Sequence, residues 1–448
     1  MLNSIPYVPH TRKDIHAMLS KIGVKDLDDL FADIPGEIKF KGDMALPMAS
    51  DEMHVVKHLR RLSKKNANLK DYTCFLGGGI YHHYIPSVVN YVASLPQFYT
   101  AYTPYQPEVS QGTLQSFFEY QSMMCELLNM EVSNASMYDG ASALAEAMLM
   151  ASRITGKYEI LISKTVHPEY VQVCKTYSRG PGIRIKMIPY DEKGKTNFNA
   201  IRGMINSNVS AAVVQTPNFF GIVESLTGLK ELPSDILKII VVNPLSLGIL
   251  KPPGDFDADI VVGEGQPLGL PPSFGGPHFG IFATKKHFIR QMPGRIIGET
   301  VDEEGKRGFV MTLQTREQHI RRQKATSNIC SNHAMGIIMA SVYLALLGKN
   351  GMRKLAELNT YKAHYLAQKF EEMDGFQLKF NAPFFNEFAV ETHLNVDTLN
   401  AELLKHKIIG PLNLEGFYPE LRNTMLFAVT EMVERKDMDT LISKLKEM

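Results

Sequence analysis

Short apolar segments alternate with helical stretches through the middle of this chain of 448 residues. Residues 142–155, rich in alanine, methionine and leucine, predict a helix, and residues 159–162 directly after them predict a buried strand. A helix at 168–177 follows, and further apolar runs predict strands at 183–188, 211–215, 239–242, 260–262 and 280–283. Short apolar strands that alternate with helices are typical of a mainly parallel sheet covered on both faces. The pattern therefore predicts an α/β domain.

The segments on either side of this alternation predict additional parts. Residues 1–65 predict a helical extension, in which Thr11 can cap the first helix. A long helix is expected from residue 108 to 130, because apolar side chains recur there at helical spacing. A helix that ends at Leu347 opens the C-terminal segment, 326–448, which predicts a smaller α+β domain. The large α/β domain then spans residues 66–325.

Charge and cysteine content exclude several classes of protein. The chain has 48 basic and 47 acidic residues and a formal net charge of +1, so neither nucleic acid nor a membrane surface is an expected partner. Its four cysteines are far apart and form no CxxC pair, which argues against disulfides and structural zinc. The N-terminus has no apolar core of signal-peptide length. We expect a cytoplasmic protein.

Two glycine-containing stretches can carry chemistry. The turn at residues 137–143 leads into a helix, where free N–H groups can bind an anion; the alternative, which the local sequence favours, is that Asp139 or Ser142 caps the helix. Three successive glycines, 77–79, disfavour regular structure, so the main chain there is expected to approach another group closely. His82 and His83 follow them, but adjacent side chains point in different directions and no carboxylate stands at metal-binding spacing. No metal site is expected.

Two further stretches with possible function lie later in the chain. One predicted strand ends just before Asn243, and the next ends before the glycine- and proline-rich loop 263–278, at the edge where open α/β sheets bind ligands. The alternative is a surface loop without function. Arg295 and the basic run from Arg316 to Lys324 favour a carboxylate or an acidic protein surface, and the alternative is a solvated helix face.

At these places the sequence resembles the glycine cleavage system P-protein family, specifically its N-terminal half or subunit 1. The matching stretches run from about residue 70 to 345. They include FLGGGIYHHYIP from Phe75, YTPYQPEVSQGTLQSFFEYQ from Tyr102, FGGPHFGIFAT from Phe274, RQMPGRIIGET from Arg290 and TREQHIRRQKATSNIC from Thr315. Stretches of this length are far more specific than a short motif.

The resemblance implies the fold-type-I fold of pyridoxal-phosphate-dependent transferases, with a mainly parallel seven-stranded sheet and a smaller C-terminal α+β domain. It also implies the activity of glycine dehydrogenase (aminomethyl-transferring, decarboxylating), EC 1.4.4.2. That enzyme decarboxylates glycine, releases CO2 and passes the aminomethyl group to the lipoyl arm of H-protein. Where the enzyme is split, the resemblance implies a heterotetramer with two copies of each subunit.

Two residues depart from the pattern of a catalytic subunit. In the comparison with the catalytic half of the family, Gln266 stands where the Schiff-base lysine would be, and Asn243 stands where an aspartate would keep the pyridine nitrogen protonated. A neutral amide cannot form an imine, and Asn243 cannot supply a negative charge. The resemblance thus implies no catalytic residue and no cofactor in this chain, and pyridoxal phosphate in the partner subunit. The Gly140 turn would be a relic of the phosphate cup.

In this fold the active site lies at the dimer interface, so the loops Gly77–Tyr84 and Tyr99–Gly112 are expected to reach the partner's cofactor pocket. The regions around Arg290 and Arg316 would contact the partner subunit or H-protein. The candidate residues are His82, His83, Tyr84, Tyr102, Tyr105, Gln106, Arg295 and Arg316. Two alternatives remain open: a self-sufficient pyridoxal-phosphate decarboxylase or lyase that uses another lysine, and a regulatory subunit whose degenerate pocket binds a ligand.

Overall fold

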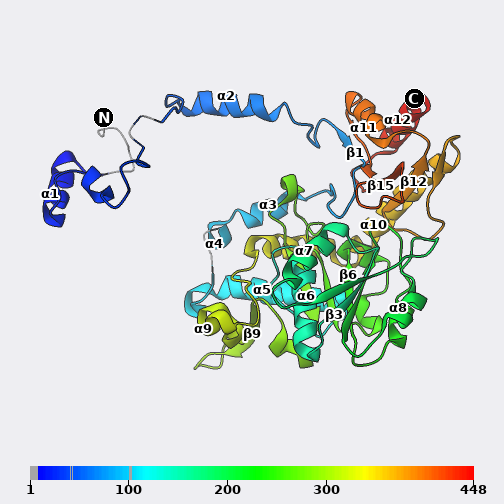
Figure 1. Cartoon of the computed structure of the whole chain (residues 1–448), viewed down its shortest axis with the longest axis horizontal. Helices are drawn as coiled ribbons and strands as arrows, with labels where there is room; N and C mark the ends of the chain where they lie inside the picture. The colour runs from blue at the N-terminus through cyan, green and yellow to red at the C-terminus, as the bar shows by residue number, and fades with distance from the viewer. Residues whose placement is uncertain (1–8, 41, 43, 100–102) are drawn as a thin grey trace. The chain divides into compact units, whose positions relative to one another are not determined.

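The computed structural model describes residues 9–40, 42, 44–99 and 103–448, and it separates into two units, Met1–Asn66 and Ala67–Met448 (Figure 1). The first unit contains α1 (Arg12–Ile22), a 3-10 helix η1 (Asp28–Phe31) and α2 (Glu52–Ser63). Thr11 caps α1 as predicted, because its hydroxyl accepts a hydrogen bond from the N–H of Asp14 and the Asp14 carboxylate accepts one from the N–H of Thr11. Among the described residues of this unit, only Leu19 is buried.

The second unit is built on a seven-stranded sheet in the order β2-β8-β7-β6-β5-β3-β4. Its strands are β2 (Val132–Ser133), β3 (Glu159–Ser163), β4 (Arg184–Ile188), β5 (Val209–Thr216), β6 (Leu237–Val242), β7 (Ile260–Glu264) and β8 (Gly280–Thr284). Neighbours from β7 to β4 pair in parallel, whereas β8 pairs antiparallel with both β7 and β2. The predicted mainly parallel sheet is confirmed.

Successive residues of the central strands face opposite sides of the sheet and enter two different cores. Leu161 and Ile240 belong to the core under α5 (Pro107–Leu128) and α10 (Ala334–Glu371), whereas their neighbours Ile160 and Ile239 belong to the core under α6 (Gly140–Thr155) and α7 (Pro168–Ser178). Because side chains alternate along a strand, a strand covered on both faces must be apolar throughout. This is why the sequence shows apolar runs rather than alternation.

Helix α10 continues well beyond the predicted end at Leu347. Gly348 interrupts it with φ 56°, a left-handed conformation that favours glycine, and the helix then resumes. The prediction therefore found only the first segment. One 18-residue window of α10 is long and apolar enough to cross a membrane by length and composition alone, and 44% of that window is buried inside the protein.

The C-terminal part forms a second, antiparallel sheet in the order β11-β12-β15-β14, which confirms the predicted smaller α+β domain. Its elements are β11 (Phe376–Leu378), β12 (Glu387–Thr392), α11 (Val396–Lys405), β13 (Ile408–Ile409), β14 (Leu412–Asn413), β15 (Thr424–Ala428) and α12 (Arg435–Lys446). β1 (Thr73–Cys74) pairs in parallel with β13, so the chain that follows the first unit is joined to this small domain before it enters the large one.

The remaining elements are short. The helices and strands among them are α3 (Ser87–Ala93), α4 (Pro96–Tyr99), α8 (Phe198–Met204), β9 (Ile296–Val301), β10 (Arg307–Thr312) and α9 (Gln318–Arg321). The 3-10 helices are η2 (Leu226–Glu231), η3 (Pro244–Gly248), η4 (Pro253–Phe256), η5 (Ser273–Gly275), η6 (Lys286–Gln291), η7 (Gln314–Arg316) and η8 (Arg322–Lys324). β9 and β10 form an antiparallel hairpin.

Candidate functional site

A small cavity lies where β5, β6 and β7 end. It is lined from the large domain by Gln215, Asn243 and Glu264, and from the small domain by Glu387. Its volume is about 30 Å³. A space of that size holds a water molecule or two, whereas pockets for small ligands are on the order of 300–1,000 Å³.

Gln266 lies at this edge of the sheet and is fully buried. Its Nε2 donates hydrogen bonds to the carbonyl oxygens of Tyr81 at 2.8 Å and Leu270 at 2.7 Å, and its Oε1 accepts one from the N–H of Tyr81 at 3.0 Å. The amide thus binds main chain on two sides, and in particular the segment that follows the three glycines. Asn243 is also engaged within the chain, because its Oδ1 accepts a hydrogen bond from the N–H of Leu245 at 3.1 Å at the start of η3.

The turn before α6 binds two carboxyl groups of this same chain. Asp139 accepts a hydrogen bond from the N–H of Ser142 at 2.7 Å, which confirms the capping interpretation. The N–H of Gly140 donates to Glu264 Oε2 at 3.0 Å. A Cβ added at Gly140 would collide with the Tyr170 hydroxyl. The end of the helix that could receive an external anion is therefore filled by protein groups.

Glu264 and Glu387 are functional candidates that the sequence reasoning missed. Burial raises the pKa of Glu264 to about 8, although the N–H groups of Gly140 and Gln266 oppose the shift. Burial likewise raises the pKa of Glu387 to about 7, against hydrogen bonds from the Tyr81 hydroxyl at 2.6 Å and the Gly78 N–H at 2.7 Å. The signal for Glu264 was an acidic residue that ends an apolar strand. Nothing local marks Glu387.

The three glycines approach other groups closely, as predicted. A Cβ at Gly77 would collide with the Glu387 carboxyl, and one at Gly79 would lie 3.0 Å from His167. The His167 ring donates through Nε2 to the carbonyl oxygen of Gly78 at 2.7 Å and stacks on Tyr170, with centroids 4.6 Å apart and an interplanar angle of 14°. Burial lowers the pKa of His167. Its ring is thus covered by a protein side chain.

These residues do not fit a pyridoxal phosphate. An imine needs a lysine, but Lys285 on the neighbouring segment pairs through Nζ with Asp257 and Asp259, each at 2.7 Å. The pyridine ring of the cofactor needs a cavity of its own size, but this cavity has room for only one or two water molecules. The phosphate needs free N–H donors, and Glu264 occupies that of Gly140. No catalytic step through this cofactor follows from the geometry of this chain.

The loop residues proposed to reach a partner are attached to the small domain. His83 is buried and pairs through Nδ1 with Glu431 at 2.9 Å, and the same carboxylate accepts a hydrogen bond from the N–H of Tyr84 at 2.6 Å. Thr430 donates to the carbonyl oxygen of His82 at 2.6 Å. The Tyr84 side chain is exposed. Tyr102 lies outside the described residues.

Arg295 and Tyr105 are brought together although 190 residues separate them. The guanidinium of Arg295 lies 5.5 Å from the centroid of the Tyr105 ring and donates to the carbonyl oxygen of Cys330 at 2.8 Å. Arg316 donates to the carbonyl oxygens of Met292 and, at 2.9 Å, Gly294. Both arginine side chains are buried.

Both arginines therefore point into this chain rather than outward. The other candidates from these regions are exposed: Gln106, Arg321, Arg322 and Lys324. The exposed positions of Arg321, Arg322 and Lys324 agree with the alternative that this basic run is a solvent-exposed surface. Whether any of these residues contributes to a partner's site stays a prediction.

The fold and the sheet edge define a class of protein, the fold-type-I α/β fold of pyridoxal-phosphate-dependent transferases. A glutamate decarboxylase from Lactobacillus brevis has this fold, with a TM-score of 0.69 at 13% identity over 92% of this chain and 95% of that one. A sphingosine-1-phosphate lyase from Burkholderia pseudomallei gives 0.66 at 12% identity over 92% and 94%. At such identities the likeness concerns the fold alone.

The family follows from closer relatives. The model of the glycine cleavage system P-protein family matches residues 6–445, and the chain belongs to this family. The probable glycine dehydrogenase (decarboxylating) subunit 1 of Anoxybacillus flavithermus is 50% identical over 98% of both chains, and that of Thermotoga petrophila is 49% identical over 98% of this chain and 99% of its own. A glycine decarboxylase (P-protein) in inhibitor-bound form has a TM-score of 0.90 at 45% identity, over 99% of this chain and 100% of that one.

Proposed function

We propose that this chain is subunit 1 of a two-subunit glycine dehydrogenase (decarboxylating) and binds no pyridoxal phosphate itself. Subunit 2 holds the cofactor. The assembly of two copies of each subunit decarboxylates glycine, releases CO2 and passes the aminomethyl group to the lipoyl arm of H-protein, in the cytoplasm. Relatives named as subunit 1 that match this chain over 98% of its length support this role.

The observation that carries the proposal is the state of Gln266. Three hydrogen bonds to main chain and complete burial make this amide part of the protein core, at the position where the resemblance expects the cofactor lysine. The buried carboxyl of Glu264 against the Gly140 turn agrees with it. A pocket filled in this way favours a subunit that supports a neighbour over a self-sufficient enzyme.

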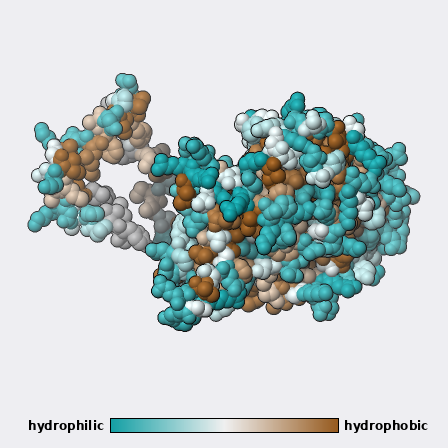
Figure 2. Space-filling model, turned by 90° about the horizontal axis from the view of Figure 1, so that it is seen from below, coloured by the Kyte–Doolittle hydropathy of each residue, from teal (hydrophilic) through white to brown (hydrophobic). Residues whose placement is uncertain are grey.

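The N-terminal unit supports assembly with another chain. Most of its apolar side chains are exposed, including Met48 at 92% and Ile38 at 72%, and Figure 2 shows apolar groups on the face in view. With only Leu19 buried among the described residues, this unit has too little core to be stable by itself. Burial of these side chains against a partner subunit would supply what the unit lacks.

Reconstitution tests the proposal directly. We expect glycine–bicarbonate exchange, in the presence of H-protein, only when this chain and subunit 2 are combined, and none from either chain alone. Borohydride reduction in the presence of pyridoxal phosphate should label a lysine of subunit 2. A labelled lysine in this chain would instead establish the self-sufficient enzyme. Stabilisation of this chain by glycine without label or exchange would establish the regulatory alternative.

A substitution of His83 tests whether the Gly77–Tyr84 loop serves the partner's site. We expect His83→Ala to lower turnover of the reconstituted complex about tenfold while assembly, measured by sedimentation, changes less. The reason is that loss of the His83–Glu431 pair frees the carboxylate that positions the N–H of Tyr84. Tyr102→Ala carries the same expectation. His287→Ala, at an exposed position, is the matched control. Equal losses of turnover and assembly would count against the loop's role.

A further inference from the structure

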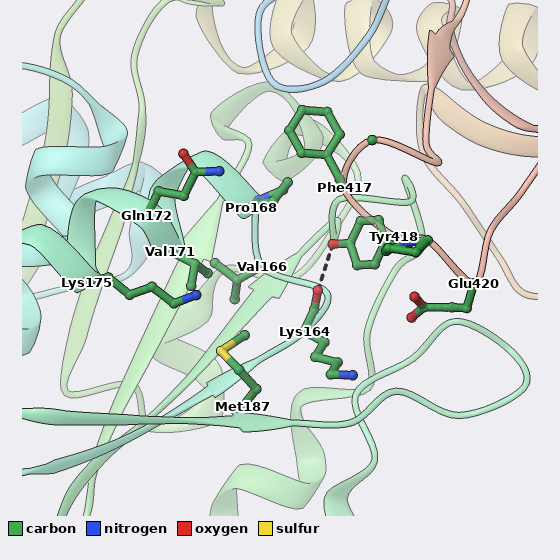
Figure 3. Close-up of a pocket in the computed structure, with 12 residues that line it drawn as sticks. Lys164, Val166, Pro168, Val171, Gln172, Lys175, Met187, Phe417, Tyr418 and Glu420 are labelled. Atoms are coloured by element: carbon green, nitrogen blue, oxygen red, sulfur yellow. Dashed lines mark hydrogen bonds between the residues drawn. The ribbon is translucent and has the colours of Figure 1, made fainter.

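A second, larger cavity lies outside the sheet edge described above. Its volume is about 330 Å³, and it opens between α7 and the segment 416–420 that joins β14 to β15 (Figure 3). One wall therefore belongs to the large domain and the other to the small domain. The Tyr418 hydroxyl donates to the carbonyl oxygen of Lys164 at 2.7 Å and ties the two walls together.

Apolar side chains line much of this cavity. Val166 and Val171 are buried on the large-domain side, Met187 lies beside them, and Phe417 covers the opposite side (Figure 3). Phe417 packs edge-on against Phe219, with ring centroids 5.7 Å apart, so its position is supported from behind. A surface of this kind favours an aromatic or branched aliphatic body about the size of one ring.

The rim of the cavity carries two lysines. Lys164 follows β3 and Lys175 lies on α7. Within the part of the chain that the structure describes, neither ammonium group has a carboxylate partner or a side-chain hydrogen bond. The one carboxylate on the rim, Glu420, accepts a hydrogen bond from the Tyr190 hydroxyl at 2.9 Å. Two cations against one carboxylate leave the rim with an excess of positive charge, which beside an apolar surface favours an anionic head group.

We propose that this cavity is a binding site for a small organic anion. Its apolar body lies against Met187, Val171 and Phe417, and its phosphate or carboxylate head lies at the rim, which the flexible side chains of Lys164 and Lys175 line from different sides (Figure 3). Because the ligand contacts both domains, its binding favours the domain arrangement seen here. Val166 and Pro168 line this cavity, and His167 between them lines the small cavity at the ends of β5, β6 and β7. The two cavities are therefore adjacent at one turn of the chain.

Phenyl phosphate is the probe of choice because it combines a head and a ring. We expect it to bind the purified chain in titration calorimetry at low ionic strength, at least about tenfold more tightly than inorganic phosphate, which lacks the ring, or phenol, which lacks the charge. Phenylacetate, which carries a carboxylate head, is the second probe. Absence of binding by both phenyl phosphate and phenylacetate at millimolar concentration would overturn the proposal.

Variants locate the binding. The double variant Lys164→Gln, Lys175→Gln should weaken phenyl phosphate binding at least about tenfold, and Phe417→Ala should remove its advantage over inorganic phosphate. Lys193→Gln, on an exposed turn, removes a similar lysine and should leave the affinity unchanged. Both lysines of the site are exposed, so the variants are expected to fold, which thermal unfolding checks. If Lys193→Gln weakened binding as much per charge, non-specific attraction would be established instead.

Discussion

Substitution of Gln266 by methionine is expected to lower the free energy of unfolding of this chain by at least about 3 kcal/mol, the lower bound for three buried groups left without partners. Methionine has a similar length and leaves little empty volume, so the effect reports the lost hydrogen bonds rather than a cavity. The change leaves the N–H and carbonyl of Tyr81 and the carbonyl of Leu270 without their partner in a fully buried place. Each such group costs about 1–3 kcal/mol. Urea unfolding at fixed pH, followed by circular dichroism, measures the difference.

The matched control is Gln115→Met on the exposed side of α5. The Gln115 amide bonds only to the Glu119 side chain, at 2.8 Å, and we expect a change within about 0.5 kcal/mol. Equal losses in the two variants would mean that the buried amide contributes no more than a surface one. Gln266 would then have no structural role. Its hydrogen bonds and burial would no longer support the proposal that this subunit is adapted to work without the cofactor.

The sheet could be predicted from sequence because its determinants are local. Residues 159–162, 239–242 and 260–262 were each predicted as strands, and each lies within the observed β3, β6 and β7. A strand that faces two cores is apolar at every position, and this leaves a mark in any short window. The reversal of β8 leaves no such mark, because direction depends on how the loop 265–279 crosses the sheet edge.

The site was predicted only in part, since most of it is made by contacts distant in sequence. Asn243 and Gln266 were found because a resemblance supplied the residues that they replace. Glu387 accepts a hydrogen bond from Tyr81, which lies 306 residues earlier in the chain, and no local sequence pattern near either residue predicts that contact. The charge of Arg295 and Arg316 predicts surface positions, but both side chains are buried. Burial is possible because each donates hydrogen bonds to carbonyl oxygens of loops from other parts of the chain.

The carboxyl group of Glu264 is expected to make the stability of the chain fall steeply as pH rises. Its pKa is about 8 in the folded chain and 4.5 as the reference for the unfolded one. A folded-state pKa above the unfolded value means that the folded chain holds a proton that the unfolded chain releases. The stabilisation is therefore fully present below about pH 4.5 and is lost as pH rises through 8, at about 1.4 kcal/mol per pH unit.

Glu264→Gln removes this titration and keeps the size of the side chain. The free energy of unfolding of the parent chain minus that of the variant should fall by about 4 kcal/mol between pH 5 and 8, because other titrating groups cancel in the difference. Glu387→Gln should show the same sign over a narrower range, since the pKa of Glu387 is about 7. Urea unfolding at four pH values gives the slopes.

Glu192→Gln, at an exposed turn position, is the control whose difference from the parent should not vary with pH. A flat difference for Glu264→Gln would show that its carboxylate is ionised in the folded chain and neutralised by some group other than its present partners. The end of α6 would then be holding a negative charge, as an anion site does. A steep difference would mean that the neutral acid fills this place, and the N–H of Gly140 would be matched to a protein group rather than to a phosphate.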